Sequence, residues 1–394
     1  LPTNPVWQGT YGSIPGLCST RENDSHSGQH LHFNNQAVGV QLYNSLSNNE
    51  RVKLIQEAGK DRLTISFYKY FKISDPETFR NKLFLFWDSI DVLGRIYVAH
   101  EGINAQLSVP ADHFETFKSH LDSINFLKNI RLNVAIEQNQ FSFLKLKVKV
   151  RNKIVSDGLN DDSFDSSNIG THVNASEFNL LVEDNNTLVV DMRNHYESEI
   201  GHFKNAVTPD VDTFRESLDL IEEDLKSHKK TKKLVMYCTG GIRCEKASAY
   251  FKHKGFKNVY QLEGGIINYA RQVTSKEVEN KFIGKNFVFD QRRAEKISDD
   301  IIASCHQCGQ PADIHVNCAN DACHLLFIQC DSCKKSMKNC CSSTCMEVNQ
   351  LPAQTQKSLR KGQGNSNDIF KKGRAGHLHY SKNLRNIHDS QPEI

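Results

Sequence analysis

The sequence lacks long apolar runs and has no strong excess of either charge. Crossing a bilayer takes about 20 consecutive apolar residues, and no stretch of the 394-residue chain approaches that length. The 49 basic and 46 acidic side chains leave a formal net charge of +3, so any surface that binds nucleic acid must be local. No charged segment followed by an apolar leader is present. We therefore expect a cytoplasmic protein that does not enter a membrane.

Cofactor motifs and disulfide patterns are absent as well. No Gly-x-Gly-x-x-Gly follows an apolar strand pattern, and no flavin, haem or nicotinamide motif is visible. The cysteines are not spread as in a secreted disulfide framework, because nine of the twelve lie between Cys305 and Cys345. In a reducing compartment such clustering indicates metal binding rather than disulfides.

The cysteine cluster predicts two structural zinc ions. Zinc prefers four thiolate or imidazole ligands in a tetrahedron, and a Cys-x2-Cys pair bends readily around one corner of it. The alternative, a small core of reduced thiols, is disfavoured because so short a segment has little apolar mass with which to fold unaided. We predict that one ion is held by Cys305, Cys308, Cys330 and Cys333, and the other by Cys318, Cys323, Cys345 and either Cys340 or Cys341.

A reactive cysteine is predicted between a strand and a helix. The short apolar run 234–237 predicts a strand that ends at Cys238, and residues at helical spacing follow the next turn. Backbone N–H groups at a helix N-terminus lack partners and favour negative charge, which lowers the pKa of a nearby thiol. Arg243 adds a fixed positive charge. We predict a Cys238 thiolate in a loop formed by Thr239, Gly240, Gly241 and Ile242.

Cys238 and Cys244 each have an alternative interpretation. Cys238 could be a buried structural cysteine, which two glycines and an arginine in the same turn disfavour. Cys244 is either a second thiol that exchanges sulfur or oxidation state with Cys238, or a small packed residue. Only four residues separate Cys238 from Arg243. Cysteine phosphatases have five at this point, so a phosphatase is not expected.

Residues 56–155 have the pattern of a ferredoxin-like domain. Two helix patterns alternate with four strand patterns in the order strand–helix–strand–strand–helix–strand. The strands are expected at 63–71, 92–99, 105–109 and 130–136, and the helices at 76–90 and 111–121. His100, Glu101 and Asn104 are expected together in one turn, where they either contact RNA or are solvated turn residues.

Three basic segments are further candidates for RNA contact. Apolar and basic residues alternate in 144–153, which predicts a strand whose cationic face either binds phosphates or protects a sheet edge from aggregation. Arg292 and Arg293 follow a strand pattern and are predicted to be available to an anion. The tail 351–394 is basic and poor in apolar residues, so it either binds RNA or is disordered.

Residues 1–55 are predicted to be a mobile segment.

The reactive loop resembles the active-site loop of a rhodanese domain. Asp191-Met-Arg193, Glu197 and the segment 201–206 match the pattern Asp-x-Arg…Glu…Gly-His-x-x-x-Ala, and 259–266 matches the closing strand and its Gly-Gly turn. This resemblance implies a parallel sheet covered on both faces over 165–298, with active groups at strand ends. Asp191 and Arg193 are expected to hold the loop rather than to react.

More narrowly, the chain resembles the oxygen-dependent tRNA uridine hydroxylase family. The motifs at 99–105, 238–244 and 305–309 together carry this likeness. It implies a ferredoxin-like domain, a rhodanese-like domain and a cysteine-rich module at 300–350. It also implies hydroxylation of the wobble uridine of tRNA to 5-hydroxyuridine, with molecular oxygen as co-substrate, the anticodon loop as partner and Cys238 as nucleophile. Cys238 would act either by reversible addition to the pyrimidine ring or in an oxidised or persulfide form, and the sequence does not choose between these. No electron donor is indicated.

Two other functions stay open on the sequence alone. A rhodanese-type loop is compatible with a sulfurtransferase that works through a persulfide on Cys238. A non-catalytic RNA-binding scaffold is also compatible with the chain, and its cysteine-rich module and basic tail would then carry the function.

Overall fold

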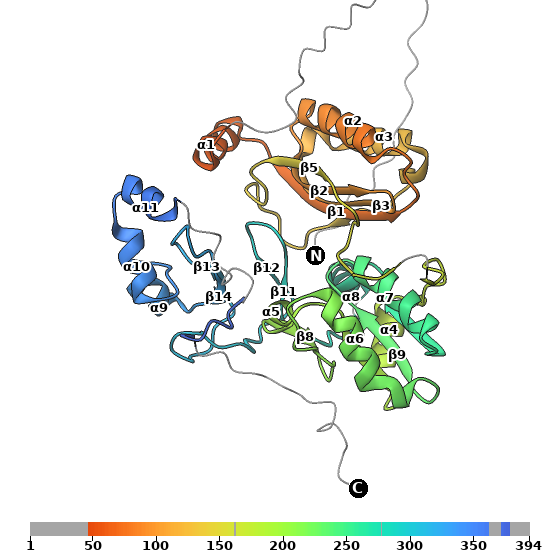
Figure 1. Ribbon diagram of the computed structural model, residues 1–394. Helices are drawn as coiled ribbons and strands as arrows, with labels where there is room; N and C mark the ends of the chain where they lie inside the picture. The colour runs from red at the N-terminus through yellow and green to blue at the C-terminus, as the bar shows by residue number, and fades with distance from the viewer. Residues whose placement is uncertain (1–45, 161–162, 277, 362–371, 379–394) are drawn as a thin grey trace, which may run out of the picture. The chain divides into compact units, whose positions relative to one another are not determined.

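The computed structural model describes residues 46–160, 163–276, 278–361 and 372–378, which all fall within one unit of the chain, Leu42–Ile394. The predicted fold class is confirmed: a ferredoxin-like α+β domain, a rhodanese-like domain with a parallel sheet, and a cysteine-rich module follow one another (Figure 1). No helix in these described ranges is long and apolar enough to cross a membrane.

The first domain is a five-stranded sheet with helices against one face (Figure 1). The strand order is β4-β1-β3-β2-β5, in which the first four places are those of a ferredoxin-like sheet and β5 is an addition that runs parallel to β2. The elements are α1 (Asn48–Ala58), β1 (Arg62–Tyr70), α2 (Pro76–Ser89), β2 (Leu93–Ala99), β3 (Gly102–Pro110), α3 (Phe114–Ser123), β4 (Asn133–Val134) and β5 (Leu146–Val150).

Alternating residues give this sheet one apolar and one polar face. On β1, Ile65 and Phe67 are buried in a core that includes Trp87 of α2 and Phe117 of α3. Ser66, which lies between them, and Tyr68 point to the opposite face, because successive side chains of a strand alternate. That opposite, polar face lines the cavity described below. Packing of the apolar core against the helices therefore leaves the polar face free to line this cavity.

Three predictions about this domain need correction. A helix, α1, begins at Asn48 with a capping box between Ser47 and Glu50, inside the segment that we predicted to be mobile. The fourth strand is only Asn133–Val134, because few of the residues predicted there pair with β1. The predicted turn is shorter than expected, since β3 already begins at Gly102. Residues 1–45 lie outside the described residues.

The second domain contains the predicted parallel sheet, in the order β6-β10-β9-β7. Adjacent residues of one strand face different cores: Met236 packs with α6 and α7, whereas Val235 packs with α4 and α8. The sheet is therefore covered on both faces. Its elements are β6 (Thr171–Val173), α4 (Ala175–Glu183), β7 (Thr187–Asp191), α5 (His195–Ser198), β8 (Gly201–Phe203), α6 (Phe214–Leu225), β9 (Lys233–Tyr237), α7 (Ile242–His253), β10 (Asn258–Leu262) and α8 (Gly265–Lys276).

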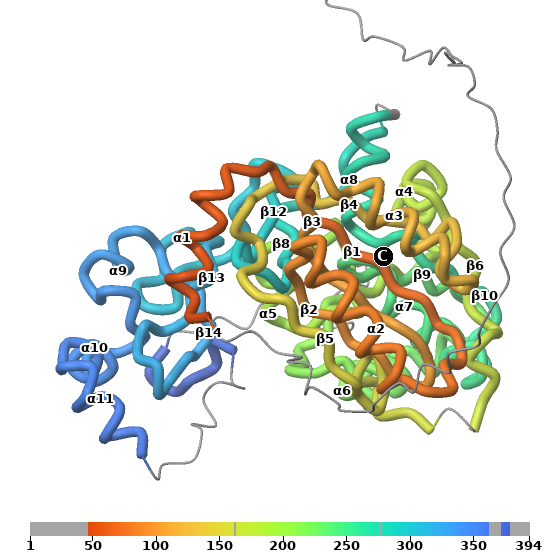
Figure 2. The backbone as a smooth tube through the Cα atoms, turned by 90° about the horizontal axis from the view of Figure 1, so that it is seen from above, coloured from red at the N-terminus to blue at the C-terminus, as the bar shows by residue number. Residues whose placement is uncertain are grey.

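The two domains contact each other around the end of β9. Figure 2 shows α8 beside β4, where Arg271 Nη1 donates a hydrogen bond to Val134 O at 3.0 Å. Tyr68 Oη, on the polar face of the first sheet, donates to Glu245 Oε1 of α7 at 3.0 Å. These contacts place the polar face of the first sheet over the loop that follows β9.

The cysteine-rich module begins beyond a small three-stranded sheet, β12-β11-β8. The strand pattern that precedes Arg292 corresponds to β11, which pairs with β8 of the rhodanese-like domain and with β12. The elements of this region are β11 (Phe282–Phe287), β12 (Ala294–Lys296), β13 (His315–Asn317), β14 (Leu326–Ile328), α9 (Asp331–Ser336), α10 (Ser343–Gln350) and α11 (Ala353–Arg360).

Part of the predicted basic tail is folded against the rest of the chain. Helix α11 occupies its beginning. In the described segment 372–378, Ala375 and Leu378 are buried among residues of the cysteine-rich module. Arg374 forms ion pairs with Asp210 and Asp212, so its charge is already matched. The remainder of the tail, residues 362–371 and 379–394, lies outside the described residues.

Candidate active site

The loop after β9 turns its backbone amides toward the Cys238 sulfur. The N–H of Gly241 donates to Cys238 Sγ at 3.1 Å. Gly241 adopts a left-handed backbone, with φ of 101°, and a Cβ at this position would lie 2.8 Å from the hydroxyl of Tyr68. Both the conformation and the close approach therefore require glycine here.

Electrostatics favour a thiolate at Cys238. Burial raises the pKa of this thiol, but the hydrogen bond from Cys244, the charge of Arg243 and the backbone N–H groups of Arg243 and Cys244 outweigh burial and lower the pKa to about 6. An ordinary cysteine has a pKa of about 8.5. Cys238 is therefore mostly ionised at neutral pH, in the form that acts as a nucleophile.

Cys244 is the protonated member of this pair of thiols. It is completely buried, and burial together with the neighbouring Cys238 charge raises its pKa well above that of an ordinary thiol. Its S–H consequently serves as a hydrogen-bond donor to the Cys238 sulfur. The structure shows Cys244 as a packed thiol that stabilises the charge on Cys238, and its exchange of sulfur or oxidation state with Cys238 stays a prediction.

Arg243 is held in place by a residue that sequence reasoning did not select. Glu197 accepts from both terminal nitrogens of Arg243, at 2.6 and 2.8 Å, and its side chain is fully buried. Thr239 Oγ1 lies 3.4 Å from Arg243 Nη2 and 3.5 Å from Glu197 Oε2. The Glu in the rhodanese pattern was the available signal, but nothing in the sequence paired it with Arg243.

Asp191 and Arg193 form a buried pair behind the loop. The Arg193 guanidinium donates to Asp191 Oδ2 at 2.6 Å and to Gly201 O at 2.6 Å, and neither side chain of the pair is exposed. The Arg193 guanidinium carbon lies 5.7 Å from the centroid of the Tyr237 ring, next to Cys238 in the chain. This arrangement ties β7 to β8 and supports the end of β9.

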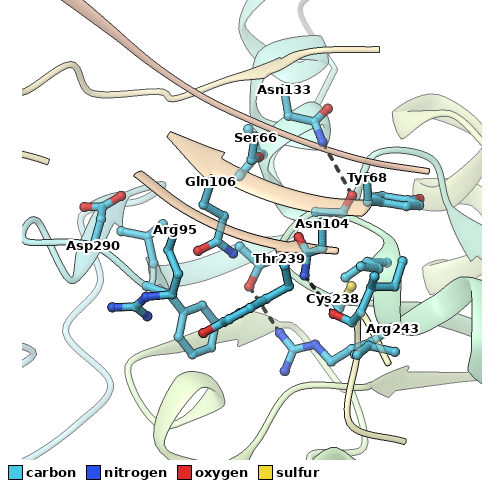
Figure 3. Close-up of a pocket in the computed structure, with 18 of the residues that line it drawn as sticks. Ser66, Tyr68, Arg95, Asn104, Gln106, Asn133, Cys238, Thr239, Arg243 and Asp290 are labelled. Atoms are coloured by element: carbon cyan, nitrogen blue, oxygen red, sulfur yellow. Dashed lines mark hydrogen bonds between the residues drawn. The ribbon is translucent and has the colours of Figure 1, made fainter. Parts of the chain in front are cut away.

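Cys238 lies in the wall of a cavity of about 660 Å³, between the polar face of the first sheet and the rhodanese loop. Only 1% of the residue is exposed, so the cavity is its route to a small reactant. Figure 3 shows Asn104 and Gln106 extending from β3 toward the side on which Thr239 and Cys238 lie. Within the described residues the Gln106 amide has no hydrogen-bond partner. The volume is in the range that holds a small molecule or a nucleoside.

The three predicted turn residues have different environments. Asn104 lines the cavity and donates to Ile154 O at 3.1 Å. Glu101 instead pairs with Lys246 of α7 at 2.8 Å and accepts from the Ile154 N–H. His100 is exposed, with Nδ1 at 3.0 Å from Ile73 O, and does not line the cavity. The structure therefore brings one of the three to the site.

The two arginines predicted to be available to an anion are engaged within the chain. Arg292 lines the cavity, but its guanidinium pairs with Asp290 and Glu295. Arg293 donates to the backbone oxygen of His315 at 3.0 Å, away from the cavity. Nothing in the sequence indicated that Asp290 and Glu295 would pair with Arg292, because an arginine after a turn can pair with any nearby acidic residue.

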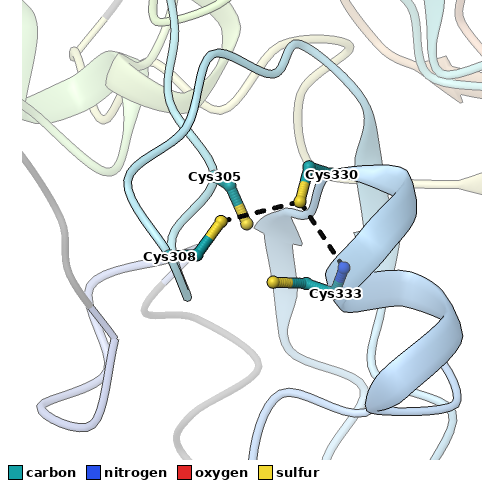
Figure 4. Close-up of side chains that lie close together, drawn as sticks. All are labelled: Cys305, Cys308, Cys330 and Cys333. Atoms are coloured by element: carbon teal, nitrogen blue, oxygen red, sulfur yellow. Dashed lines mark hydrogen bonds between the residues drawn. The ribbon is translucent and has the colours of Figure 1, made fainter.

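The cysteines of the C-terminal module form two groups of four. One consists of Cys305, Cys308, Cys330 and Cys333 (Figure 4), and the other of Cys318, Cys323, Cys341 and Cys345. Within each group all four Sγ atoms lie within 4.8 Å of one another, and the described cysteines form no disulfide. The structure thus places Cys341 in the second group. The Cys340 thiol is instead directed at the backbone oxygen of Lys338, at 3.7 Å.

The sulfur spacing suits tetrahedral zinc. Zinc–sulfur bonds of about 2.3 Å in a tetrahedron give sulfur–sulfur edges of about 3.8 Å. Cys308 and Cys330 are 3.6 Å apart, and Cys341 lies 3.7 Å from both Cys323 and Cys345. Each group therefore fits one ion with four thiolate ligands and no open position, which is typical of a structural site.

Comparison with known proteins supports this division of the chain. Three family models match: the UPF0176 acylphosphatase like domain at residues 62–154, the Rhodanese-like domain at 174–272 and the Rhodanase C-terminal model at 283–346. A Leptospira interrogans protein named tRNA uridine(34) hydroxylase is 52% identical over 322 residues, covering 82% of this chain and 88% of that protein. The chain belongs to the tRNA uridine(34) hydroxylase family.

Other members of the family are equally similar. Relatives with the same name are 51% identical in Escherichia fergusonii and 53% identical in Yersinia pestis, each over 335 residues and 84% of this chain. The matches cover 95% and 94% of those relatives. The tRNA uridine(34) hydroxylase likeness therefore extends over all three parts of the chain and is not limited to the rhodanese loop.

Proposed function

We propose that this protein hydroxylates uridine 34 of tRNA and that Cys238 is its reactive group. The observation that carries the proposal is a Cys238 thiolate in the wall of a nucleoside-sized cavity, in a chain whose relatives are named for this activity. The name of these relatives favours neither the sulfurtransferase nor the scaffold alternative.

In this proposal the Cys238 thiolate adds to C6 of the uracil ring. Such an addition moves negative charge to C5 and O4 and makes C5 nucleophilic toward dioxygen. Once a reductant has cleaved the O–O bond and left a hydroxyl group on C5, loss of the C5 proton to solvent and of the thiolate from C6 restores the double bond of the ring. The loop amides, the Cys244 thiol and Arg243 stabilise the sulfur anion before the addition and again when the thiolate leaves the ring. Gln106 and Asn104, on the opposite wall, offer amide groups to the polar edge of the base.

Balance of the reaction requires a reductant. Conversion of uridine to 5-hydroxyuridine by dioxygen places one oxygen atom in the base and reduces the other to water, which consumes two electrons and two protons. The anticodon loop suits the reaction because its bases are unpaired, and a single base enters a cavity at little cost in stacking energy. A cytoplasmic location, where tRNA is available, fits this substrate.

The direct test is incubation of the purified protein with unmodified tRNA, a chemical reductant and isotopically labelled dioxygen, followed by mass spectrometry of the nucleosides. The proposal expects one labelled oxygen atom in uridine 34. Unlabelled hydroxyuridine would assign the oxygen to water. A thiolated base would instead support the sulfurtransferase alternative.

Zinc in the two cysteine groups gives the C-terminal module its folded form in this proposal. Metal analysis of the purified chain is expected to find two zinc ions, one for each group of four cysteines. Cys341→Ser is expected to lose one ion and to destabilise the module. Cys340→Ser, a change at the adjacent cysteine outside both groups, is the matched control and should keep both ions. Equal losses in the two variants would contradict this ligand assignment.

A further inference from the structure

A row of positive charges lies on the edge of the first sheet. Strand β5 runs parallel to β2, and the register pairs Arg95 with Lys147 and Tyr97 with Lys149. Paired residues of neighbouring strands point to the same face, whereas Ile96 and Val148, between them, belong to the apolar core. Arg95, Lys147 and Lys149 therefore share the polar face of the sheet. We call these three residues, together with Arg151, the β5 cationic strip.

The charges of this strip are not neutralised within the described residues. None of its four side chains forms an ion pair there, and Arg151 is instead placed over the Tyr97 ring, 5.5 Å from its centroid. Lys147 and Lys149 are exposed. Partial burial is the main cause that lowers the pKa of Lys147, and the nearby charges of Arg95, Lys149 and Lys145 act in the same direction. A group of like charges without acidic partners costs free energy, so the strip suits an anionic ligand.

The strip is continuous with the cavity that contains Cys238. Arg95 and Tyr97 line the cavity, and each pairs in register with a lysine of the strip. In Figure 3 Arg95 lies well away from Cys238, on the same side of the sheet as Gln106 and Asn104. A base that enters the cavity past Arg95 would have its flanking sugar and phosphate groups toward Arg95 and β5.

We propose that the β5 cationic strip binds the phosphodiester backbone of the RNA strand whose uridine enters the cavity. This inference rests on the proposed function for the identity of the nucleic acid. It assigns Arg95, Lys147, Lys149 and Arg151 to positioning the RNA, because contacts with phosphates set register and affinity and do not take part in the chemistry.

A protective role for an edge strand explains less of this arrangement. Lysines on an edge strand do prevent pairing with a second chain. Arg95, however, is on β2, which is covered on one side by β3 and on the other by β5. An arginine on an inner strand gives no protection to the edge, yet it lies in register with the lysines and lines the cavity.

The experiment compares tRNA binding by the full chain and by the double variant Lys147→Ala/Lys149→Ala over a range of salt concentrations. Each lost phosphate contact is expected to reduce the slope of log K against log [salt] by about 1, so the slope should fall by about 2. At 0.1 M salt the affinity should fall between about tenfold and a hundredfold. In the hydroxylation assay KM should rise by a similar factor with kcat unchanged.

The matched control is Lys230→Ala/Lys232→Ala. These lysines precede β9 and lie at the end of that strand opposite to Cys238, and their loss changes the net charge equally. Equal effects of the two double variants would overturn the inference, since they would show a response to net charge alone. An unchanged salt slope in the Lys147/Lys149 variant would also overturn it. Because binding is measured without turnover, a wild-type chain that binds tRNA but does not hydroxylate it would refute the proposed function and leave this inference standing.

Discussion

Cys238→Ser is expected to reduce kcat for hydroxylation of uridine 34 by at least about a thousandfold, the scale at which removal of a covalent nucleophile is felt in other enzymes. A serine hydroxyl is not ionised at neutral pH, so the loop amides and Arg243 no longer hold an anion that can add to the base. Affinity for tRNA should stay within about twofold, because the substitution changes one atom inside the cavity and leaves the β5 cationic strip, where we propose that the phosphates bind, unchanged.

Cys340→Ser is the control for Cys238→Ser, because it makes the same chemical change at a buried cysteine outside the cavity and outside both cysteine groups. The two variants are compared by single-turnover kinetics with saturating protein. Substantial turnover by Cys238→Ser would show that another group carries the reaction.

The second large effect is expected on stability, from Glu197→Gln. Glu197 is fully buried and balances the charge of the nearly buried Arg243 through two hydrogen bonds. Glutamine keeps the shape but removes the carboxylate charge that is the main partner of the guanidinium. Breaking a buried ion pair in this way costs about 3–5 kcal/mol of the free energy of unfolding. At about 2–4 °C per kcal/mol, thermal unfolding of the rhodanese-like domain should shift down by roughly 10 °C.

Glu223→Gln is the matched control for this effect. Glu223 pairs with Lys226 on the surface of α6, where both side chains are largely exposed, and exposed pairs contribute little. We expect no measurable shift for it in differential scanning calorimetry. Similar shifts in the two variants would mean that the buried pair does not hold the loop.

The reactive loop was predictable because all its parts are close in sequence. The apolar strand, the cysteine, the two glycines and the start of the helix each specify local structure, and the structure places them as the pattern indicates. Asp191 and Arg193 are also close neighbours, so their pairing could be expected. Local patterning likewise predicted α2, since Asp75 accepts from the Thr78 N–H at 3.0 Å and Pro76 begins the helix.

The rest of the site depends on contacts between distant segments, which local patterns do not encode. Glu197 reaches Arg243 across 46 positions of the chain, and Tyr68 reaches Glu245 across 177. The sequence left the choice between Cys340 and Cys341 open, because adjacent cysteines are chemically identical and only the direction of the backbone decides which side chain faces the other three. Arg292 was misjudged for a related reason: its acidic partners became visible only once the chain was folded.

The pH dependence of alkylation at Cys238 tests the central claim most directly, namely that the loop holds a thiolate in the cavity at neutral pH. Iodoacetamide reacts with the thiolate only, and mass spectrometry of the digested chain follows the residue by itself. With a pKa of about 6, the rate should rise through pH 6 and stay constant above about pH 7. A rate that is still rising above pH 7 and reaches half its maximum only near pH 8.5, as it does for an ordinary thiol, would contradict the account.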